Sequence, residues 1–278
     1  AIGGLAVVIV GEAKPTARTD FTGMVGVKWL NGTPTILAQP TGAGNYKAVA
    51  VSGDGNVIGG LAVISGFNIP ILWTGPAAPE QLLQVGTTSP VQNGVTFNAE
   101  ITGISRDGSV IAAIGGRGQQ WGANGTIVGP NVQALRWTRA TGFVELGVLA
   151  SHSAAGASSL ANDISADGGT IVGSSQQGGV MGNDLYKDDN LIAIKWTEAG
   201  GMVALPKLTN QLASVATGVN ADGSVIVGEA IVPGQTIGTF VVNESHAVRW
   251  TSRNAQTVAA WLSANGVANG TNQYQEAL

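Results

Sequence analysis

Short apolar runs interrupted by turn residues follow one another along most of the chain. Around residues 161–173 a partly apolar run leads to an Asp-Gly pair, and a second apolar run then ends in a small residue. Short runs of this kind, bounded by Gly, Asn or Asp, are typical of β-strands. Asp-Gly between two such runs favours a hairpin with a type I′ turn, in which both central residues have positive φ. We therefore expect many short antiparallel strands.

The same pattern returns four times along the chain, with Asp-Gly pairs separated by about 53 to 60 residues. After each pair comes a Trp-Thr pair, and after three of these a Gly-x-Val-x-Leu-like segment follows at 142–146, at 201–205 and more loosely at 81–85. Four short strands with their loops need roughly 40–50 residues, as in propeller blades. The pattern predicts strand 1 before Asp-Gly, strand 2 after it, strand 3 ending at Trp-Thr, and strand 4 in the last segment. The repeated residues are Asp54, Asp107, Asp167 and Asp222 in the turns and Trp73, Trp137, Trp196 and Trp250 in the Trp-Thr pairs.

A fifth copy is divided between the chain ends. Residues 7–13 (VVIVGEA) match residues 224–230 (SVIVGEA), and Trp29 follows, but Leu5-Ala6 replaces Asp-Gly and strand 1 is nearly missing. Residues 276–278 joined to residues 1–3 resemble the start of another strand 1, and pairing of this kind removes exposed sheet edges. We predict an all-β fold: a β-propeller of about five four-stranded blades, closed by pairing of the N- and C-terminal segments. The alternative is a larger ring of which this chain is a fragment. The predicted blades of the single propeller domain are approximately residues 1–47, 48–98, 99–158, 159–213 and 214–278.

The repeated residues resemble the HAF-type extracellular repeats, in which small-x-x-[IV]-S-x-D-G-x-x-[IV]-V-G precedes A-x-x-W-T and G-x-x-x-L. Residues 161–205 match this pattern throughout, and the WLSANG run at 261–266 is similar to a segment that often follows the last repeat. The resemblance implies a bacterial secreted protein or an autotransporter passenger region, hence an extracellular or cell-surface location. It implies no activity, because the shared residues belong to turns and core.

Composition narrows the possible partners. Gly makes up 42 of 278 residues without a Gly-X-Y period, and charged residues only 11%, so tight turns are expected and collagen is excluded. A net charge of −4 with scattered Lys and Arg provides no basic patch for nucleic acid. The absence of Cys excludes disulfides and thiolate metal sites. No apolar stretch reaches the roughly 18 residues of a membrane helix, so we expect no membrane insertion by this chain.

Most repeated residues are expected to be structural. Aspartate in an Asp-Gly turn hydrogen-bonds its own backbone, and a Trp at one fixed blade position packs between sheets. Trp121 differs, because it lies in a polar insertion between residues 115 and 133. An exposed aromatic ring among amides suits stacking on a sugar, although a loop that folds down on its own Trp is an equal alternative.

Residues 183–190 form the densest acidic cluster of the chain. Calcium prefers several oxygen ligands on a short loop, and this segment offers Asp184, Asp188 and Asp189 beside two Asn side chains. The spacing is not that of an EF-hand, and Lys187 neutralises neighbouring charge, so a solvated loop is the simpler interpretation. Calcium is the one cofactor that we consider; otherwise none is expected.

Strand 1 carries the remaining candidate residues. Four positions before each turn aspartate stands a small residue, except for Asp163 in the fourth blade, while Glu100 and Lys47 share the position seven before the turn. Five-bladed furanosidases place three carboxylates around the ring axis, and Asp163, Glu100 and Glu276 could imitate that arrangement if they stand within about 5–10 Å. We assign no catalytic residue, since none of them belongs to a catalytic motif. His152 and His246 are isolated and receive no role.

These observations favour a secreted or surface-displayed binding or adhesion module, with carbohydrate or a surface protein as ligand. Rigid strands that carry variable loops are the common arrangement for recognition. A subunit of an extracellular filament or layer is the second hypothesis, because a first blade without its strand 1 can accept a strand from another chain. A glycoside hydrolase built on the axis carboxylates is the third.

Overall fold

The computed structural model describes residues 7–15, 23–82, 91–92, 95–117, 120–121, 127–128, 132–152, 156–177, 191–237, 240–252 and 254–267. Contacts along the chain divide it into two compact units, which are described separately below. The first unit is Ala1–Gly129 with Ala134–Glu145, and the second is Pro130–Gln133 with Leu146–Leu278.

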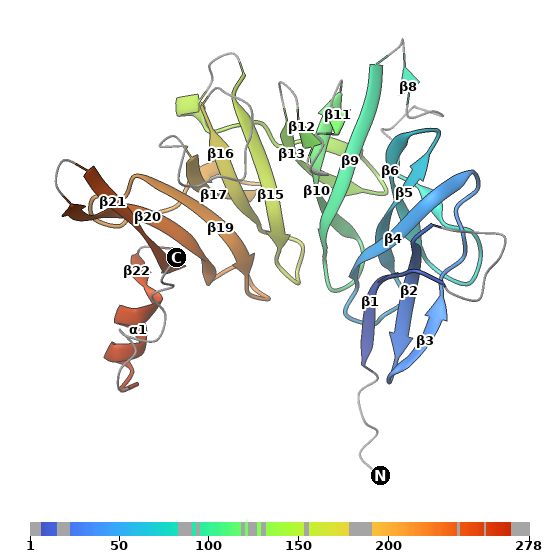
Figure 1. Cartoon of the computed structure of the whole chain (residues 1–278), viewed down its shortest axis with the longest axis horizontal. Coiled ribbons are helices and arrows are strands. Elements are labelled where there is room, and N and C mark those ends of the chain that lie inside the picture. Colours follow the sequence, from blue (N-terminus) through green and yellow to red (C-terminus); the bar gives the residue numbers. More distant parts are fainter. Residues whose placement is uncertain are drawn as a thin grey trace. The chain divides into compact units, whose positions relative to one another are not determined.

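The first unit contains three antiparallel sheets, with neighbouring strands side by side in Figure 1. The first sheet has the order β1-β2-β3 and the second the order β4-β5-β6-β7, while the third has the order β14-β13-β10-β9-β8. A separate two-stranded ribbon, β11-β12, is inserted between β10 and β13. The strands are β1 (Val8–Ala13), β2 (Val25–Leu30), β3 (Thr33–Ile36), β4 (Ala43–Val51), β5 (Ile58–Ile64), β6 (Phe67–Trp73), β7 (Glu80–Gln81), β8 (Val91–Gln92), β9 (Val95–Ile104), β10 (Val110–Arg117), β11 (Gln120–Trp121), β12 (Ile127–Val128), β13 (Gln133–Thr138) and β14 (Gly142–Glu145).

The second unit contains two four-stranded antiparallel sheets, β15-β16-β17-β18 and β19-β20-β21-β22. A short 3₁₀ helix precedes the first of them, and a short α-helix, whose N-cap is Thr257, follows the second. Its elements are η1 (Ala150–His152), β15 (Ser158–Ile164), β16 (Ile171–Gln176), β17 (Leu191–Thr197), β18 (Gly201–Ala204), β19 (Ala213–Val219), β20 (Ile226–Ile237), β21 (Phe240–Trp250), β22 (Ala255–Thr257) and α1 (Val258–Ala264).

Apart from the ribbon β11-β12, each sheet corresponds to one copy of the repeat, which agrees with the predicted number of blades. In the second to fifth blades, strands 1 to 4 of the repeat lie side by side in sequence order, and β8 adds a further strand at the edge of the third blade. In the first blade only strands 2 to 4 are described, as β1, β2 and β3. The terminal segments 1–3 and 276–278 lie outside the described residues, so closure by their pairing stays a prediction.

The Asp-Gly hairpins form as predicted, but the predicted type I′ turn was wrong. Only the glycine has positive φ, between 71° and 74° in the four copies, while the aspartate does not. The backbone N–H of Ser105 donates to the Val110 carbonyl at 2.9 Å, so the loop between the strands has four residues. Loops of this length are most often built around a type I turn. Positive φ at two successive residues occurs instead at Asn31-Gly32 and at Ser65-Gly66.

Strand 1 of each complete blade contains a bulge at the same repeat position. The ladder shifts by one residue at Val49, Thr102, Asn162 and Thr217. A bulge bends the strand and brings its backbone close to the partner strand. A Cβ atom on the facing glycine of strand 2 would therefore lie only 2.0 to 2.1 Å from a carbonyl oxygen of strand 1. This holds for Gly60, Gly173 and Gly228.

Three of the four tryptophans of the Trp-Thr pairs are core residues, as predicted. Trp73, Trp137 and Trp250 are buried, whereas Trp196 is partly exposed, as is Trp29, which is followed by Leu30. Two indole N–H groups donate at 2.8 Å to carbonyl oxygens of the connection that enters their own blade: Trp73 to Ala38 and Trp250 to Pro206. The ring thus packs inside the blade, and its one polar group fastens the chain between blades.

Candidate functional site

Each blade has two chemically different ends. The turn end is where the Asp-Gly turn joins strands 1 and 2, and the loop end is where strand 2 joins strand 3. The two ends are opposite each other because consecutive strands are antiparallel.

At the turn end, successive blades of one unit are hydrogen-bonded to each other. The Gly53 N–H donates to the Arg106 carbonyl at 2.7 Å, and the Asp167 N–H donates to the Ala221 carbonyl at 3.2 Å. Lys28 Nζ donates to the Gly55 carbonyl at 2.8 Å. The donors differ from one pair of blades to the next, but each contact joins the turn end of one blade to that of its neighbour, so the turn end is a structural seam.

The aspartates of this seam stabilise their own turns. In the third blade, one carboxylate oxygen of Asp107 accepts from the Ser105 hydroxyl at 2.7 Å and from the Ser109 N–H at 3.0 Å. Hydrogen bonds of this kind favour the ionised form, so the Ser52 hydroxyl and Asn56 lower the pKa of Asp54 to about 2. Asp107, Asp167 and Asp222 have lowered pKa values for the same reason. All four aspartates therefore have an intrachain function, as predicted.

The loop end varies from blade to blade. Two-residue connections join strands 2 and 3 at 65–66 in the second blade and at 238–239 in the fifth. The corresponding connections at 14–24, 118–132 and 177–190 in the other blades are far longer. Insertions are thus confined to the loop end, where a constant scaffold carries variable segments.

Trp121 belongs to such an insertion. Its backbone lies in β11, where Gln120 pairs with Val128 and Trp121 with Ile127. The two-stranded ribbon projects from the connection between β10 and β13. The predicted carbohydrate contact of Trp121 remains a prediction, since the ribbon establishes the backbone position alone.

The predicted calcium ligands Asp184, Asp188 and Asp189 lie outside the described residues. Within the part of the chain that is described, no group of three or more Asp, Glu or His side chains could hold a metal ion.

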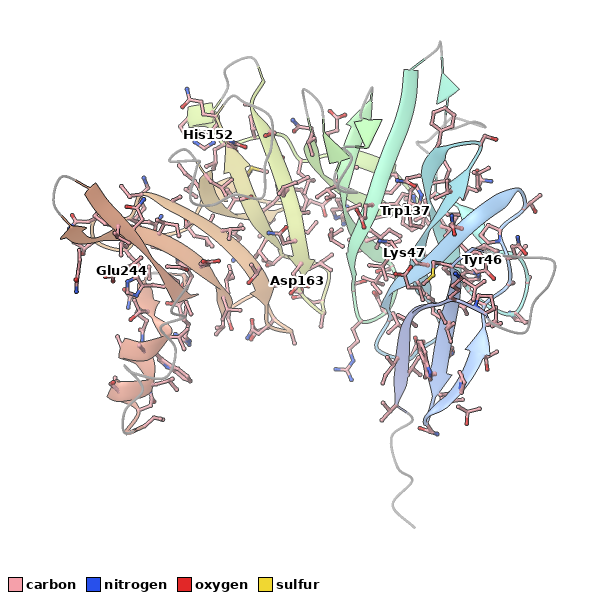
Figure 2. The ribbon with its side chains drawn as sticks, viewed as in Figure 1. Tyr46, Lys47, Trp137, His152, Asp163 and Glu244 are labelled. Carbon is pink, nitrogen blue, oxygen red and sulfur yellow. The ribbon has the colours of Figure 1, made fainter. Side chains whose placement is uncertain are left out.

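Asp163 is engaged by the backbone of two blades. Its Oδ1 accepts from the Ile164 N–H at 2.8 Å, and its Oδ2 accepts from the Val219 N–H of the next blade at 2.9 Å. The neighbouring bulge residue Asn162 donates from Nδ2 to the Ala216 carbonyl, also at 2.8 Å. Asn162 and Asp163 together form a clamp between β15 and the bulge of β19. Figure 2 labels Asp163 on its strand.

Glu100 links two blades of the first unit. Its Oε1 lies 3.1 Å from Lys47 Nζ, and the two side chains are 23% and 37% exposed. Both residues occupy the same repeat position on strand 1 of adjacent blades, so the ion pair joins β4 to β9. Asp163 belongs to the second unit and Glu276 lies outside the described residues. Convergence of the three carboxylates at an axis therefore remains a hypothesis.

The two histidines lie in different environments, which the sequence did not distinguish. His246 Nε2 lies 3.4 Å from Glu244 Oε2 on the partly exposed strand β21. His152 is only 3% exposed, and its Nδ1 lies 3.0 Å from the Ser175 hydroxyl. The one signal in the sequence was Ser174-Ser175-Gln176, a polar run in a strand 2 that is apolar in the second blade.

Three solved structures illustrate what the fold is similar to. The chain aligns with a prolyl endopeptidase at a TM-score of 0.51 and 11% identity, over 88% of this chain and 34% of that chain. The β-propeller domain of the Trilobed protease from Pyrococcus furiosus aligns at 0.49 and 9% identity, over 93% and 69%. TolB from Acinetobacter baumannii aligns at 0.45 and 12% identity, over 90% and 56%. The chain thus spans about half of that TolB and a third of the prolyl endopeptidase.

No protein-family model and no curated protein matches the chain. Among the described residues, no helix is long and apolar enough to span a membrane. At identities near 10% the similarity extends to the fold alone. Taken with the blade-like sheets, it agrees with the predicted fold class: the chain is an all-β protein of the β-propeller class.

Proposed function

We propose that the chain is a secreted or surface-displayed binding module of the HAF-type extracellular repeat family, with carbohydrate as its ligand. The observation that carries the proposal is the difference between the two ends of each blade. The turn ends of neighbouring blades within a unit are hydrogen-bonded to each other, whereas the loop end carries all the long insertions between strands 2 and 3. Variable segments on a rigid scaffold are the usual arrangement for recognition.

Trp121 is the proposed sugar-stacking residue, since it is the aromatic side chain of the ribbon inserted at the loop end of the third blade. Calcium bound by Asp184, Asp188 and Asp189 would be a second contribution from the loop end of the fourth blade. Neither site involves the turn aspartates, whose carboxylates already accept hydrogen bonds within their turns.

The test is a glycan-array screen of the purified chain with and without calcium. We expect binding to one sugar class, weakened about three- to tenfold by Trp121→Ala, which is the range that loss of one stacked ring produces. Trp261→Ala is the matched control, because Trp261 is 36% exposed and belongs to α1, which follows strand 4 of the fifth blade and is not part of a strand 2–3 insertion. Loss of binding without calcium would support the acidic loop. A blank array under both conditions would overturn the carbohydrate proposal.

The structural-subunit hypothesis has one specific observation in its favour. The Asn31 N–H donates to the Val7 carbonyl at 3.0 Å. In an antiparallel pair every second residue hydrogen-bonds to the partner strand. The backbone groups of Val8, Val10 and Glu12 therefore face away from β2. No other strand of the described residues pairs with that edge. The hydrolase hypothesis has no comparable support, because Asp163 and Glu100 are each engaged by groups of the fold.

A further inference from the structure

The connection that enters the fourth blade carries a buried histidine. Residues 146–152 run from the end of β14 through η1 toward β15, and both Leu149 and His152 are buried. They lie at the loop end, because β15 begins at Ser158, which pairs with Gln176 at the end of β16.

Two hydroxyl groups of the sheet, those of Ser175 and Ser159, fasten this connection. Ser175 Oγ, fully buried on β16, accepts from the Leu149 N–H at 3.2 Å and lies 3.0 Å from His152 Nδ1. The same oxygen lies 3.4 Å from the Ser158 carbonyl, to which its own proton can be donated. A second tie is the Ser159 hydroxyl, which donates to the Gly147 carbonyl at 2.6 Å.

The surroundings of His152 suit an uncharged ring. The nearby ends of β15 and β16 present Ser158, Ser174, Ser175 and Gln176, none of which carries a charge. The charged group that acts on the ring is Lys207, from the connection between β18 and β19. Among the described residues no carboxylate pairs with His152. Burial, and secondarily the positive charge of Lys207, lower the pKa of His152.

We propose that residues 146–152 form a pH-sensitive latch, held on β16 while His152 is neutral and released when His152 is protonated. Protonation does not remove the hydrogen bond, because Ser175 Oγ can accept from both Leu149 and the imidazolium. It places a charge in a buried site where no carboxylate of the described residues serves as a counter-ion, and such a charge is stabilised by opening to water. The proposal concerns the connection itself and is independent of any ligand.

The direction of the pH dependence follows from linkage. The unfolded or opened segment titrates near the ordinary pKa of 6.5, and the closed segment titrates lower. The latch is therefore fully stable above about pH 6.5 and loses stability as the pH falls below that value. The maximal gain in opening is about tenfold for each unit by which the closed form lowers the pKa.

Native-state hydrogen exchange of the whole chain tests the latch. We expect the protection factors of the Leu149 and His152 amides, corrected for intrinsic exchange, to fall between about pH 7.5 and about pH 5. The chain contains two histidines, so one substitution at each of them covers every imidazole group of the protein. His152→Gln, which is neutral throughout, should remove the pH dependence, whereas His246→Gln should leave it unchanged.

Equal protection ratios in the wild type and in His152→Gln would overturn the proposal. If His152→Gln fails to fold, an NMR titration of the two imidazole rings in the wild type replaces it, with His246→Gln assigning the signals. A titration midpoint for His152 at or above that of an ordinary histidine would equally contradict the latch.

Discussion

At the residue scale, each hairpin turn depends on a glycine that no other residue replaces easily. Gly108 has φ near 73°, and a Cβ there would lie 2.6 Å from a methyl group of Val57 in the preceding blade. Gly55 and Gly223 contact Val8 and Thr170 in the same way. The turn glycine therefore serves both the hairpin and the packing between blades.

Replacing Gly108 with Ala, beside a matched control, should separate the cost of the left-handed backbone from the cost of the contact with Val57. We expect a loss of about 2–4 kcal/mol in the free energy of unfolding, from the left-handed backbone and the overpacking against Val57 together. Gly32→Ala is the matched control, since Gly32 has φ near 85° but no atom lies within 4 Å of the place that an added methyl group would take. Its cost should be only the backbone part, about 1–2 kcal/mol. Equal losses in urea unfolding would show that contact with Val57 contributes nothing.

At the element scale, adjacent strands 1 are joined by different devices in the two units. In the first unit the half-exposed Lys47–Glu100 ion pair joins β4 to β9. In the second unit Asn162 and Asp163 reach backbone groups beside the bulge of β19. A bulge leaves ladder groups unpaired, so a side chain from the neighbouring blade can satisfy them.

The contacts of Asp163 should contribute more to the free energy of unfolding than the Lys47–Glu100 ion pair does. Asp163→Ala leaves the N–H groups of Ile164 and Val219 without their acceptor, and we expect a loss of about 2–4 kcal/mol in the free energy of unfolding. Glu100→Ala removes a partly exposed ion pair and should cost no more than about 1 kcal/mol. Urea unfolding of both variants checks the order. A smaller loss for Asp163→Ala than for Glu100→Ala would argue that Asp163 is retained for a ligand instead of for the fold.

At the scale of the whole molecule, the first blade matters most for assembly. The side chains of Val7, which directly precedes β1, and of Ile9, on β1, are each 58% exposed, beside the edge that has no partner strand among the described residues. An apolar strand with free backbone groups is a template for pairing with another strand.

If the chain is a structural subunit, this edge is where copies should meet. The wild type should then show a molecular size that increases with concentration in sedimentation velocity, and Ile9→Lys should reduce it, because a charged side chain disfavours strand pairing at an edge. Ile36→Lys, at a similarly exposed position on β3, is the control. A concentration-independent size of the wild type would count against the structural-subunit hypothesis.

The strands and hairpins of each blade were largely predictable from the sequence. Asp-Gly between apolar runs, Trp-Thr and Gly-x-Val-x-Leu mark the four strands of each blade because turn chemistry and strand alternation are properties of neighbouring residues. The turn type was not predictable from the dipeptide, since the preceding Ser105, or its equivalent, accepts a strand N–H on its side chain and lengthens the loop.

The order of residues along the chain was therefore enough to predict the repeat, the strand order and the core tryptophans. The roles of Asp163, Glu100 and His152 emerged only from the folded chain, because their partners come from strands or connections distant in the sequence. Asp163, a carboxylate considered for an axis site, accepts hydrogen bonds from the backbone of two blades, and His152, which belongs to no motif, is buried beside hydroxyl groups. Such assignments depend on which polar groups meet across blades, and that is a consequence of packing.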